Sequence, residues 1–156
     1  MSLVNVKKYF ESVGLGERVK DLSDSSATVE LAAQAVGCEA KQIVKTMTFL
    51  VSEKPIMIVC AGNVKIDNSK YKAQFYEKAK MIPAAMVEEY IGHGIGGICP
   101  FVVKDGVSVY LDESLKVNSV VYPGAGNEHS VVELSLQELE DNARAIAWID
   151  VCKVIE

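Results

Sequence analysis

Apolar residues recur along this 156-residue chain at two spacings, and each spacing predicts a different kind of element. Repeats of about 3.6 residues over Val4–Val13 and Thr28–Val36 predict amphipathic helices. Ser25 and Ser26 are candidate N-caps for the second of these, and Gly37 is expected to end it. The pattern therefore predicts two helices near the N-terminal end of the chain.

Short stretches rich in β-branched residues predict strands elsewhere. Val44–Val51 and Ile56–Cys60 are separated by the polar segment Ser52–Pro55, which predicts a β-hairpin. Further strands are expected at Arg18–Leu22, Val107–Leu111, Ser119–Tyr122, Val131–Leu134 and Ala145–Val154.

Three more helices are expected. Asp67 or Asn68 caps one that runs to about Lys78, Ala84–Ile91 forms a short one that Gly92 ends, and Ser135 with Glu138 makes a capping box for the last. Helices and strands are mixed without a regular β-α-β alternation. This order predicts an α+β fold with a mixed, largely antiparallel sheet, in one domain spanning residues 1–156.

The composition is that of an ordinary globular protein, with 49% hydrophobic and 24% charged residues. No apolar run approaches the roughly 18 residues that a membrane span needs, and the first residues lack a signal-peptide pattern. We therefore expect a cytoplasmic protein with no membrane partner. The four cysteines are scattered and only two histidines are present, so we expect no metal site and no other cofactor.

Charge is unevenly distributed around a net value of −5, which argues against a large basic surface for nucleic acid. Residues 65–80 carry five lysines against two acidic residues, whereas residues 128–150 carry six acidic residues against one arginine. The basic stretch is either a small electrostatic contact area or simply a solvated helix face.

The segment Gly92–Phe101 holds four glycines within six residues and closes with a proline. Such a segment is typical of a turn whose backbone approaches another molecule. Its spacing matches the dinucleotide fingerprint G-x-G-x-x-G, but that motif lies between a strand and a helix. Here a helix precedes the glycines and a strand or turn follows them, so we reject dinucleotide binding.

Two side chains near this segment could carry chemistry. Cys99, with His93 or His129, could form a thiol nucleophile, although a buried or turn cysteine is the simpler interpretation. Lys45 begins an apolar strand, where it is either the last solvated residue or a point charge for a phosphate or carboxylate.

Taken together, several motifs give the chain a family resemblance. They are Thr28–Gly37, Ile43–Thr46, Gly96–Pro100 and Val120–Asn127 together with Leu134. In this order and spacing they resemble the YbaK/prolyl-tRNA-synthetase-associated domain family, whose members are trans-editing aminoacyl-tRNA deacylases. The resemblance runs from about Ser26 to Leu139 and implies a barrel-like sheet flanked by helices. It also implies hydrolysis of a mischarged aminoacyl-tRNA carrying a small amino acid, such as Ala, Cys, Ser or Thr.

The resemblance also implies which residues form the site. Lys45 matches a lysine that positions the substrate and terminal nucleotide, and Gly96, Gly97 and Pro100 match the loop that holds the scissile carbonyl. No catalytic triad is required, because the ribose hydroxyl of the tRNA assists the attacking water. The expected substrate-binding residues are Ile98, Cys99, Gly124, Gly126, Asn127 and His129, whereas His93 is expected on the loop surface. Val102 departs from the family, because many relatives carry a glycine shortly after the proline.

The expected partners are the acceptor end of an aminoacyl-tRNA and a synthetase. The stretch Lys65–Lys80, with Tyr71 and Tyr76 as stacking platforms, is a candidate contact surface for the tRNA. The alternative is a non-catalytic tRNA- or synthetase-binding paralogue of the same fold, which the net acidity and Val102 both favour.

Overall fold

The structure is a computed structural model that describes residues 2–22 and 28–155. Its α-helices begin where capping side chains are available: Thr28 accepts a hydrogen bond from Leu31 N, Asp67 accepts from Ser69 N and Lys70 N, and Ser135 accepts from Glu138 N. The α-helices are α1 (Ser2–Ser12), α2 (Val29–Val36), α3 (Asn68–Phe75), α4 (Val87–Ile91) and α5 (Leu136–Ala143). Single 3₁₀ turns lie at Gly16–Arg18, Ala40–Gln42, Ala84–Met86 and Glu113–Val117.

The central sheet has the order β2-β3-β5-β9 and combines both pairing directions. β2 runs antiparallel to β3, whereas β5 lies parallel to β3 and β9 parallel to β5. Three antiparallel two-stranded pairs, β1-β7, β4-β10 and β6-β8, complete the strands of the described residues. The strands are β1 (Val19–Asp21), β2 (Val44–Val51), β3 (Lys54–Ala61), β4 (Val64–Ile66), β5 (Ser108–Asp112), β6 (Val120–Val121), β7 (Ser130–Val132), β8 (Leu134–Ser135), β9 (Ala147–Ile149) and β10 (Cys152–Val154).

The α+β class and the largely antiparallel pairing are confirmed. The predicted hairpin is also confirmed: β2 and β3 pair from Val44↔Ala61 to Val51↔Lys54, and Ser52 and Glu53 turn the chain with positive φ angles of 49° and 68°. The capping box at Ser135 and the end of α2 at Gly37 are present as expected. Ser25 and Ser26 lie outside the described residues.

The strands of the described residues form four sheets, and no closed barrel is found among them. One expectation about the strands is wrong. The single strand expected at Ala145–Val154 is divided, because Val151 N donates to the Asp112 carboxylate and turns the chain between β9 and β10. β9 then joins the central sheet and β10 pairs with β4, a strand that the sequence pattern did not indicate.

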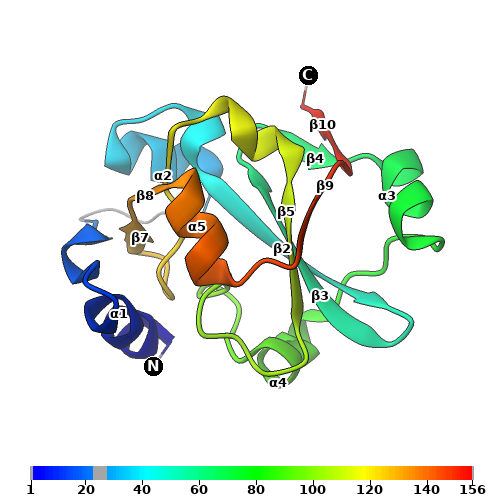
Figure 1. Cartoon of the computed structure of the whole chain (residues 1–156), viewed down its shortest axis with the longest axis horizontal. Helices are drawn as coiled ribbons and strands as arrows, with labels where there is room; N and C mark the ends of the chain where they lie inside the picture. The colour runs from blue at the N-terminus through cyan, green and yellow to red at the C-terminus, as the bar shows by residue number, and fades with distance from the viewer. Residues whose placement is uncertain (1, 23–27, 156) are drawn as a thin grey trace.

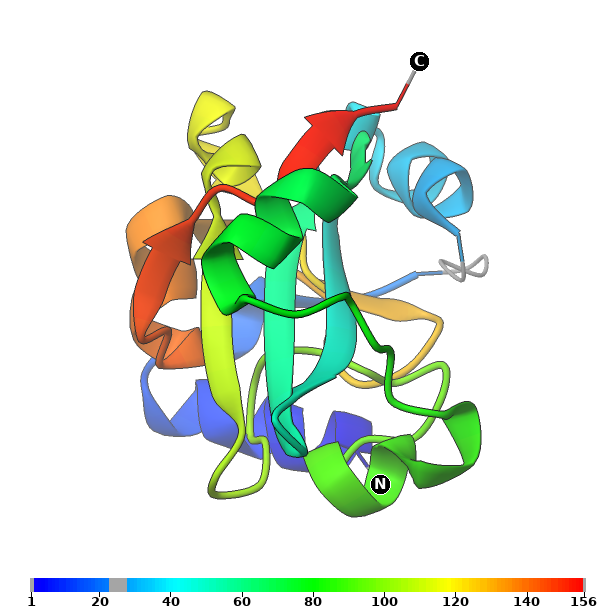
Figure 2. The ribbon, with the colours of Figure 1, turned by 90° about the vertical axis from the view of Figure 1, so that its right-hand side faces the viewer.

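The central sheet separates α3 from the other long helices. Seen nearly edge-on, the sheet has α3 on one side and α1 and α5 on the other (Figure 1). The orthogonal view places α3 in front of the strands of the central sheet (Figure 2). On the α1 side, Tyr9 Oη donates to Asn142 Oδ1 of α5 at 2.7 Å. The smaller strand pairs β1-β7 and β6-β8 lie on this side as well, and they help to form the candidate site.

The core is continuous between the sheet and these flanking elements. β3 is its centre, because Met57, Ile58, Val59, Cys60 and Ala61 are all fully buried. Phe10 of α1 reaches this core and packs edge-on against Phe101 at 4.9 Å between ring centroids. No helix of the described residues has the length and apolar character to cross a membrane.

Candidate active site

The first glycine-rich segment is a loop with a buried base and an exposed tip. α4 ends at Gly92 in the left-handed conformation (φ 101°), and the chain then turns at residues 94–97 through a hydrogen bond from Gly97 N to Gly94 O of 3.0 Å. Ile95 is 67% exposed at the tip, and Gly96 beside it is exposed as well. The tip therefore presents one large apolar side chain and a stretch of glycine backbone to solvent.

The base of the loop is closed by His93, which is only 1% exposed. Its Nε2 lies 2.6 Å from the carbonyl oxygen of Phe101, so Nε2 carries the hydrogen and donates it. Cys99 is fully buried beside this bond, with Sγ 3.6 Å from Nε2. The prediction that His93 lies on the loop surface is wrong, because the imidazole joins the two ends of the loop.

The second glycine-rich segment is the turn that connects β6 to β7. Ala125 N donates to Ser130 O, and Asn127 Oδ1 accepts from His129 N at 2.8 Å. Gly126 has a φ of 113°, and a Cβ there would lie 2.6 Å from the backbone nitrogen of Leu3 at the start of α1. The turn is therefore tight and is packed closely under the first helix.

The two glycine-rich segments contact each other. A Cβ on Gly97 would come under 3.0 Å from the carbonyl oxygen of Gly126, so the two backbones meet where only glycine fits. Beside this contact, Gly96 (φ 89°) faces the Glu128 carboxylate, with Oε1 3.0 Å from the position of a Cβ. The contact joins two loops that lie about thirty residues apart in the sequence.

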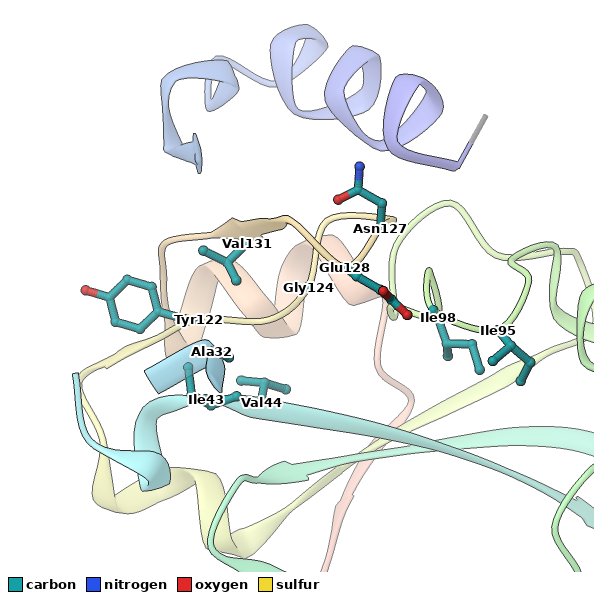
Figure 3. A pocket seen from close by; sticks show the side chains of 11 residues that line it. Ala32, Ile43, Val44, Ile95, Ile98, Tyr122, Gly124, Asn127, Glu128 and Val131 are labelled. Atoms are coloured by element: carbon teal, nitrogen blue, oxygen red, sulfur yellow. The ribbon is translucent and has the colours of Figure 1, made fainter. Parts of the chain in front are cut away.

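A cavity of about 300 Å³ opens beside this junction (Figure 3). Its floor is apolar and comes from α2, the start of β2 and β7. Isolated β-bridges join Ile43 to Tyr122 and Gly124 to Val131 beneath it. The described residues that line it are Ala32, Ile43, Val44, Ile95, Gly96, Ile98, Tyr122, Gly124, Asn127, Glu128 and Val131. A concave apolar site with a few polar groups at its rim is typical of small-ligand binding.

Four of the predicted site residues line this cavity: Gly96, Ile98, Gly124 and Asn127. Gly97 and Gly126 form the junction beside it. Their roles toward a substrate stay predictions, but the structure brings both predicted glycine segments to one place. His129 is exposed and follows Asn127 in the turn without lining the cavity.

Pro100 faces the other side of the first loop. It lines a second cavity of about 320 Å³, together with Tyr9, Val102 and Arg144. Val102, the residue that departs from the family, adopts a φ of 53°, which is unfavourable for a β-branched side chain. The loop therefore forms a wall between two cavities, and its conformation includes one strained residue.

Lys45 lies next to the candidate cavity in sequence but not among its lining residues. Successive side chains of a strand point to opposite faces, and Val44 lines the cavity. The Lys45 ammonium instead donates a hydrogen bond to the carbonyl oxygen of Val64 in β4. Its predicted contact with the substrate stays a prediction.

The Cys99 thiol is in a poor position to act as a nucleophile. Burial raises the pKa of Cys99 to about 12, and burial also lowers the pKa of His93. Because His93 Nε2 already donates to Phe101, it cannot accept the thiol proton. Cys99 is also absent from the cavity lining, so its predicted contact with substrate has no support in this geometry. The arrangement is that of a packed structural cysteine.

Sequence reasoning missed several lining residues, of which Glu128 is the most informative. It directly follows the predicted turn Gly124–Asn127, and its position after a glycine-rich turn was the available signal. Ile43, Val44 and Tyr122 lie in the motifs Ile43–Thr46 and Val120–Asn127, but no contact with a ligand was expected of them.

The predicted tRNA contact surface is only partly available. Tyr71 is fully buried against Phe75 and Phe49, so the prediction that it stacks on a base is wrong. Tyr76 is 89% exposed at the end of α3. Lys70 is paired with Asp150 at 2.9 Å, and this contact raises the pKa of Lys70.

Comparison with known proteins identifies the family. The sequence model of the aminoacyl-tRNA editing domain matches residues 23–142, and this chain belongs to that family. YwhH, an uncharacterized protein of Bacillus subtilis (strain 168), is 41% identical over 154 residues, which cover 98% of both proteins.

Two further similar proteins have names that refer to prolyl-tRNA synthesis or its editing. The proline–tRNA ligase of Limosilactobacillus fermentum (strain NBRC 3956 / LMG 18251) is 31% identical over 106 residues, which cover 64% of this chain but 18% of the ligase. A crystal structure of a protein proposed to be a trans-editing enzyme for prolyl tRNA synthetase superposes with a TM-score of 0.86 and 27% identity, covering 97% of each chain. The resemblance stated from the sequence motifs is thus confirmed.

Proposed function

We propose that this protein is a trans-editing hydrolase that deacylates a mischarged aminoacyl-tRNA carrying a small amino acid such as Ala, Cys, Ser or Thr. One observation carries the proposal: within the family match, two glycine-rich loops converge on a cavity of about 300 Å³. This volume is near the lower end of the roughly 300–1,000 Å³ range of ligand pockets, which suits a small acyl group.

The chemistry needs oxyanion donors more than a nucleophilic side chain. Water adds to the acyl carbon, the ester C–O bond breaks, and the proton from water passes to the ribose oxygen that leaves. Gly97 N is engaged with Gly94 O, whereas the amides of Gly96 and Ile98 have no acceptor in the described part of the chain. These two amides are our candidates for stabilising the developing oxyanion, a contribution typically worth about 10²–10³ in rate per donor.

Lys45 enters the proposal as a residue that positions the terminal nucleotide. Its strand neighbour Val44 lies in the cavity wall, and its four-carbon side chain is long enough to adopt other directions once the ammonium leaves Val64 O. The partners proposed are the acceptor end of a tRNA and a synthetase that produces the mischarged ester. We place the reaction in the cytoplasm, where tRNAs are charged.

A panel of mischarged tRNAs tests the proposal by measuring release of the amino acid. We expect the wild-type protein to hydrolyse at least one small aminoacyl ester, and Lys45→Ala to reduce that rate. Gly96→Ala should lower it roughly 10²-fold, because an alanine is strained at a φ of 89° and its Cβ presses on the Glu128 carboxylate, so the Gly96 amide loses its alignment.

Gly106→Ala is the matched control for Gly96→Ala. Gly106 has nearly the same φ, 91°, but no atom lies within 4 Å of where its Cβ would be. Gly106→Ala therefore introduces the same backbone strain away from the candidate cavity. Hydrolysis that is absent with every ester, or equal in wild type and Lys45→Ala, would overturn the proposal. Retention of tRNA or a synthetase without turnover would instead support the non-catalytic paralogue.

A further inference from the structure

Glu128 is the one charged side chain among the described residues that line the candidate cavity. The rest of the lining is apolar or uncharged, and no lysine or arginine of the described chain belongs to it. A phosphate inside this cavity would therefore find no cationic side chain to bind among the described lining residues, whereas a cationic group would find one carboxylate.

The carboxylate of Glu128, an exposed residue, lies beside the first glycine loop. Oε1 and Cγ of Glu128 lie 3.0 and 3.4 Å from where a Cβ of Gly96 would be, so the side chain rests against the Gly96 backbone. In Figure 3 the Glu128 carboxylate extends toward Ile98, whereas the Asn127 side chain points away from Ile95 and Ile98. The acidic group is thus directed to the same part of the loop that offers backbone amides.

We propose that the Glu128 carboxylate binds the α-ammonium group of the aminoacyl ester and thereby orients its carbonyl carbon toward the amides of Gly96 and Ile98. This inference rests on the proposed deacylase function and names the recognition element of that site. The α-ammonium is separated from the ester carbonyl by one carbon, so the protein groups that bind them must lie side by side. Glu128 and Gly96 satisfy this requirement.

Electrostatics favours the same assignment. A carboxylate at the mouth of a site that receives a polyanion repels it, unless the incoming end of the nucleic acid carries a cation. An α-amino group has a pKa near 8, so an aminoacyl end is largely protonated at neutral pH and supplies that cation. A tRNA end without an amino acid lacks this cation. Glu128 therefore favours the aminoacylated end over the deacylated tRNA product.

The placement of the ammonium and the carbonyl also determines where the amino-acid side chain points. With its ammonium at Glu128 and its carbonyl at the loop, the side chain points to the apolar floor formed by Ala32, Ile43 and Val44. Small uncharged side chains fit this floor. An acidic side chain is repelled by Glu128 and meets no cation among the lining residues.

The test compares Glu128→Gln with wild type on two forms of the ester that the wild-type protein hydrolyses: the free amine and its N-acetyl derivative. We expect kcat/KM for the free amine to fall roughly tenfold to hundredfold in Glu128→Gln, as for loss of a charge-assisted hydrogen bond. On the N-acetyl ester, which has no ammonium, the two proteins should have equal kcat/KM. Equal rates on the free amine, or the same fold-loss on both substrates, would overturn the proposal.

Glu53→Gln is the charge-matched control, because Glu53 lies in the hairpin turn at the far end of β2 from Val44 and is 83% exposed at its side chain. It removes the same charge and should leave kcat/KM unchanged. Glu128→Asp, which keeps the charge on a shorter side chain, should restore part of the activity that Glu128→Gln loses.

A binding measurement separates this inference from the proposed function. Titration with 3′-alanylamino-3′-deoxyadenosine, an amide that is not hydrolysed as an ester, reports recognition without turnover. We expect weaker binding to Glu128→Gln than to wild type, and no such difference for the N-acetyl analogue. If no ester is hydrolysed but this difference is seen, the deacylase proposal fails and the ammonium site stands. If wild type and Glu128→Gln bind the amide equally, or wild type does not bind it, the ammonium site fails.

Discussion

Gly97 and Gly126 meet backbone to backbone, at a distance that leaves no room for a Cβ on Gly97. This single contact joins the loop after α4 to the turn between β6 and β7. Neighbours of this contact in both segments, Gly96 and Asn127, line the candidate cavity. The close approach explains why position 97 needs glycine, whereas a Cβ on Gly126 would collide with the start of α1.

Gly97→Ala should destabilise the protein by about 1–3 kcal/mol, because the added methyl group forces the two loops apart. The denaturant midpoint measures the change in free energy of unfolding. Gly124→Ala is the matched control. Gly124 lies in the second loop, its φ is not positive, and the atom nearest to where its Cβ would be is Ile98 O, at 4.0 Å. Equal stability of the two variants would contradict the tight contact.

Val102→Gly should stabilise the protein by on the order of 1 kcal/mol. Valine at a φ of 53° is strained, and its side chain is already 44% exposed, so little packing is lost with it. Val102→Ala separates the two effects, because alanine keeps the Cβ and hence most of the backbone strain. Thermal unfolding of the three proteins should rank Val102→Gly highest. A lower midpoint for glycine than for wild type would show that the valine side chain contributes more than its backbone strain costs.

The stability of the protein should fall as the pH drops below about 6.5. Burial lowers the pKa of His93 in the folded state from its ordinary value of 6.5, so the unfolded chain binds a proton that the folded chain does not. The stabilisation is fully present above pH 6.5 and is lost as the pH falls toward the folded pKa, by at most about 1.4 kcal/mol per pH unit.

Urea unfolding at several pH values measures this dependence. His93→Gln should flatten it between pH 6.5 and 5, whereas His129→Gln should leave it unchanged because His129 is exposed. The chain has only these two histidines, so the comparison is direct. An unchanged slope in His93→Gln would assign the acid sensitivity to the carboxylates.

Cys99 should resist alkylation in the folded protein. Its thiol is fully buried and its pKa is raised to about 12, so the thiolate is scarce at any pH below 10. Mass spectrometry after iodoacetamide treatment at pH 8 should find Cys38, which is partly exposed, labelled before Cys99.

Cys99→Ala should retain the deacylase activity of the wild type. Rapid labelling of Cys99 in the native state, or an inactive Cys99→Ala variant that folds normally, would restore the thiol-nucleophile alternative.

The elements that sequence could predict are those with local causes. β2 was predicted to the residue because its apolar run and the turn at Ser52 act over neighbouring positions. The capping box at Ser135 is likewise local. β4 and the division between β9 and β10 could not be predicted, because they depend on Asp112, which accepts a hydrogen bond from Val151 across 39 residues.

The candidate site divides in the same way. The two glycine segments were identified from their composition and family motifs, but their mutual contact is a tertiary property. His93 was misplaced because a histidine among glycines has no periodic neighbours to indicate burial. The directions of Glu128 and Lys45 could not be predicted, since both depend on how the loops and β4 pack after folding.

The bond between His93 and Phe101 gives the glycine loop two separately adjustable parts. The ends of the loop are fixed inside the core, where His93 and Cys99 have almost no exposed surface. Ile95 at the tip contributes a largely exposed side chain to the cavity without belonging to that anchor, whereas Ile98 lines the cavity and also packs against the core. The ester preference can therefore change by exchange at Ile95 while the folding of the chain is preserved. The same separation makes Ile95 the natural first position to randomise when selecting for hydrolysis of a different ester.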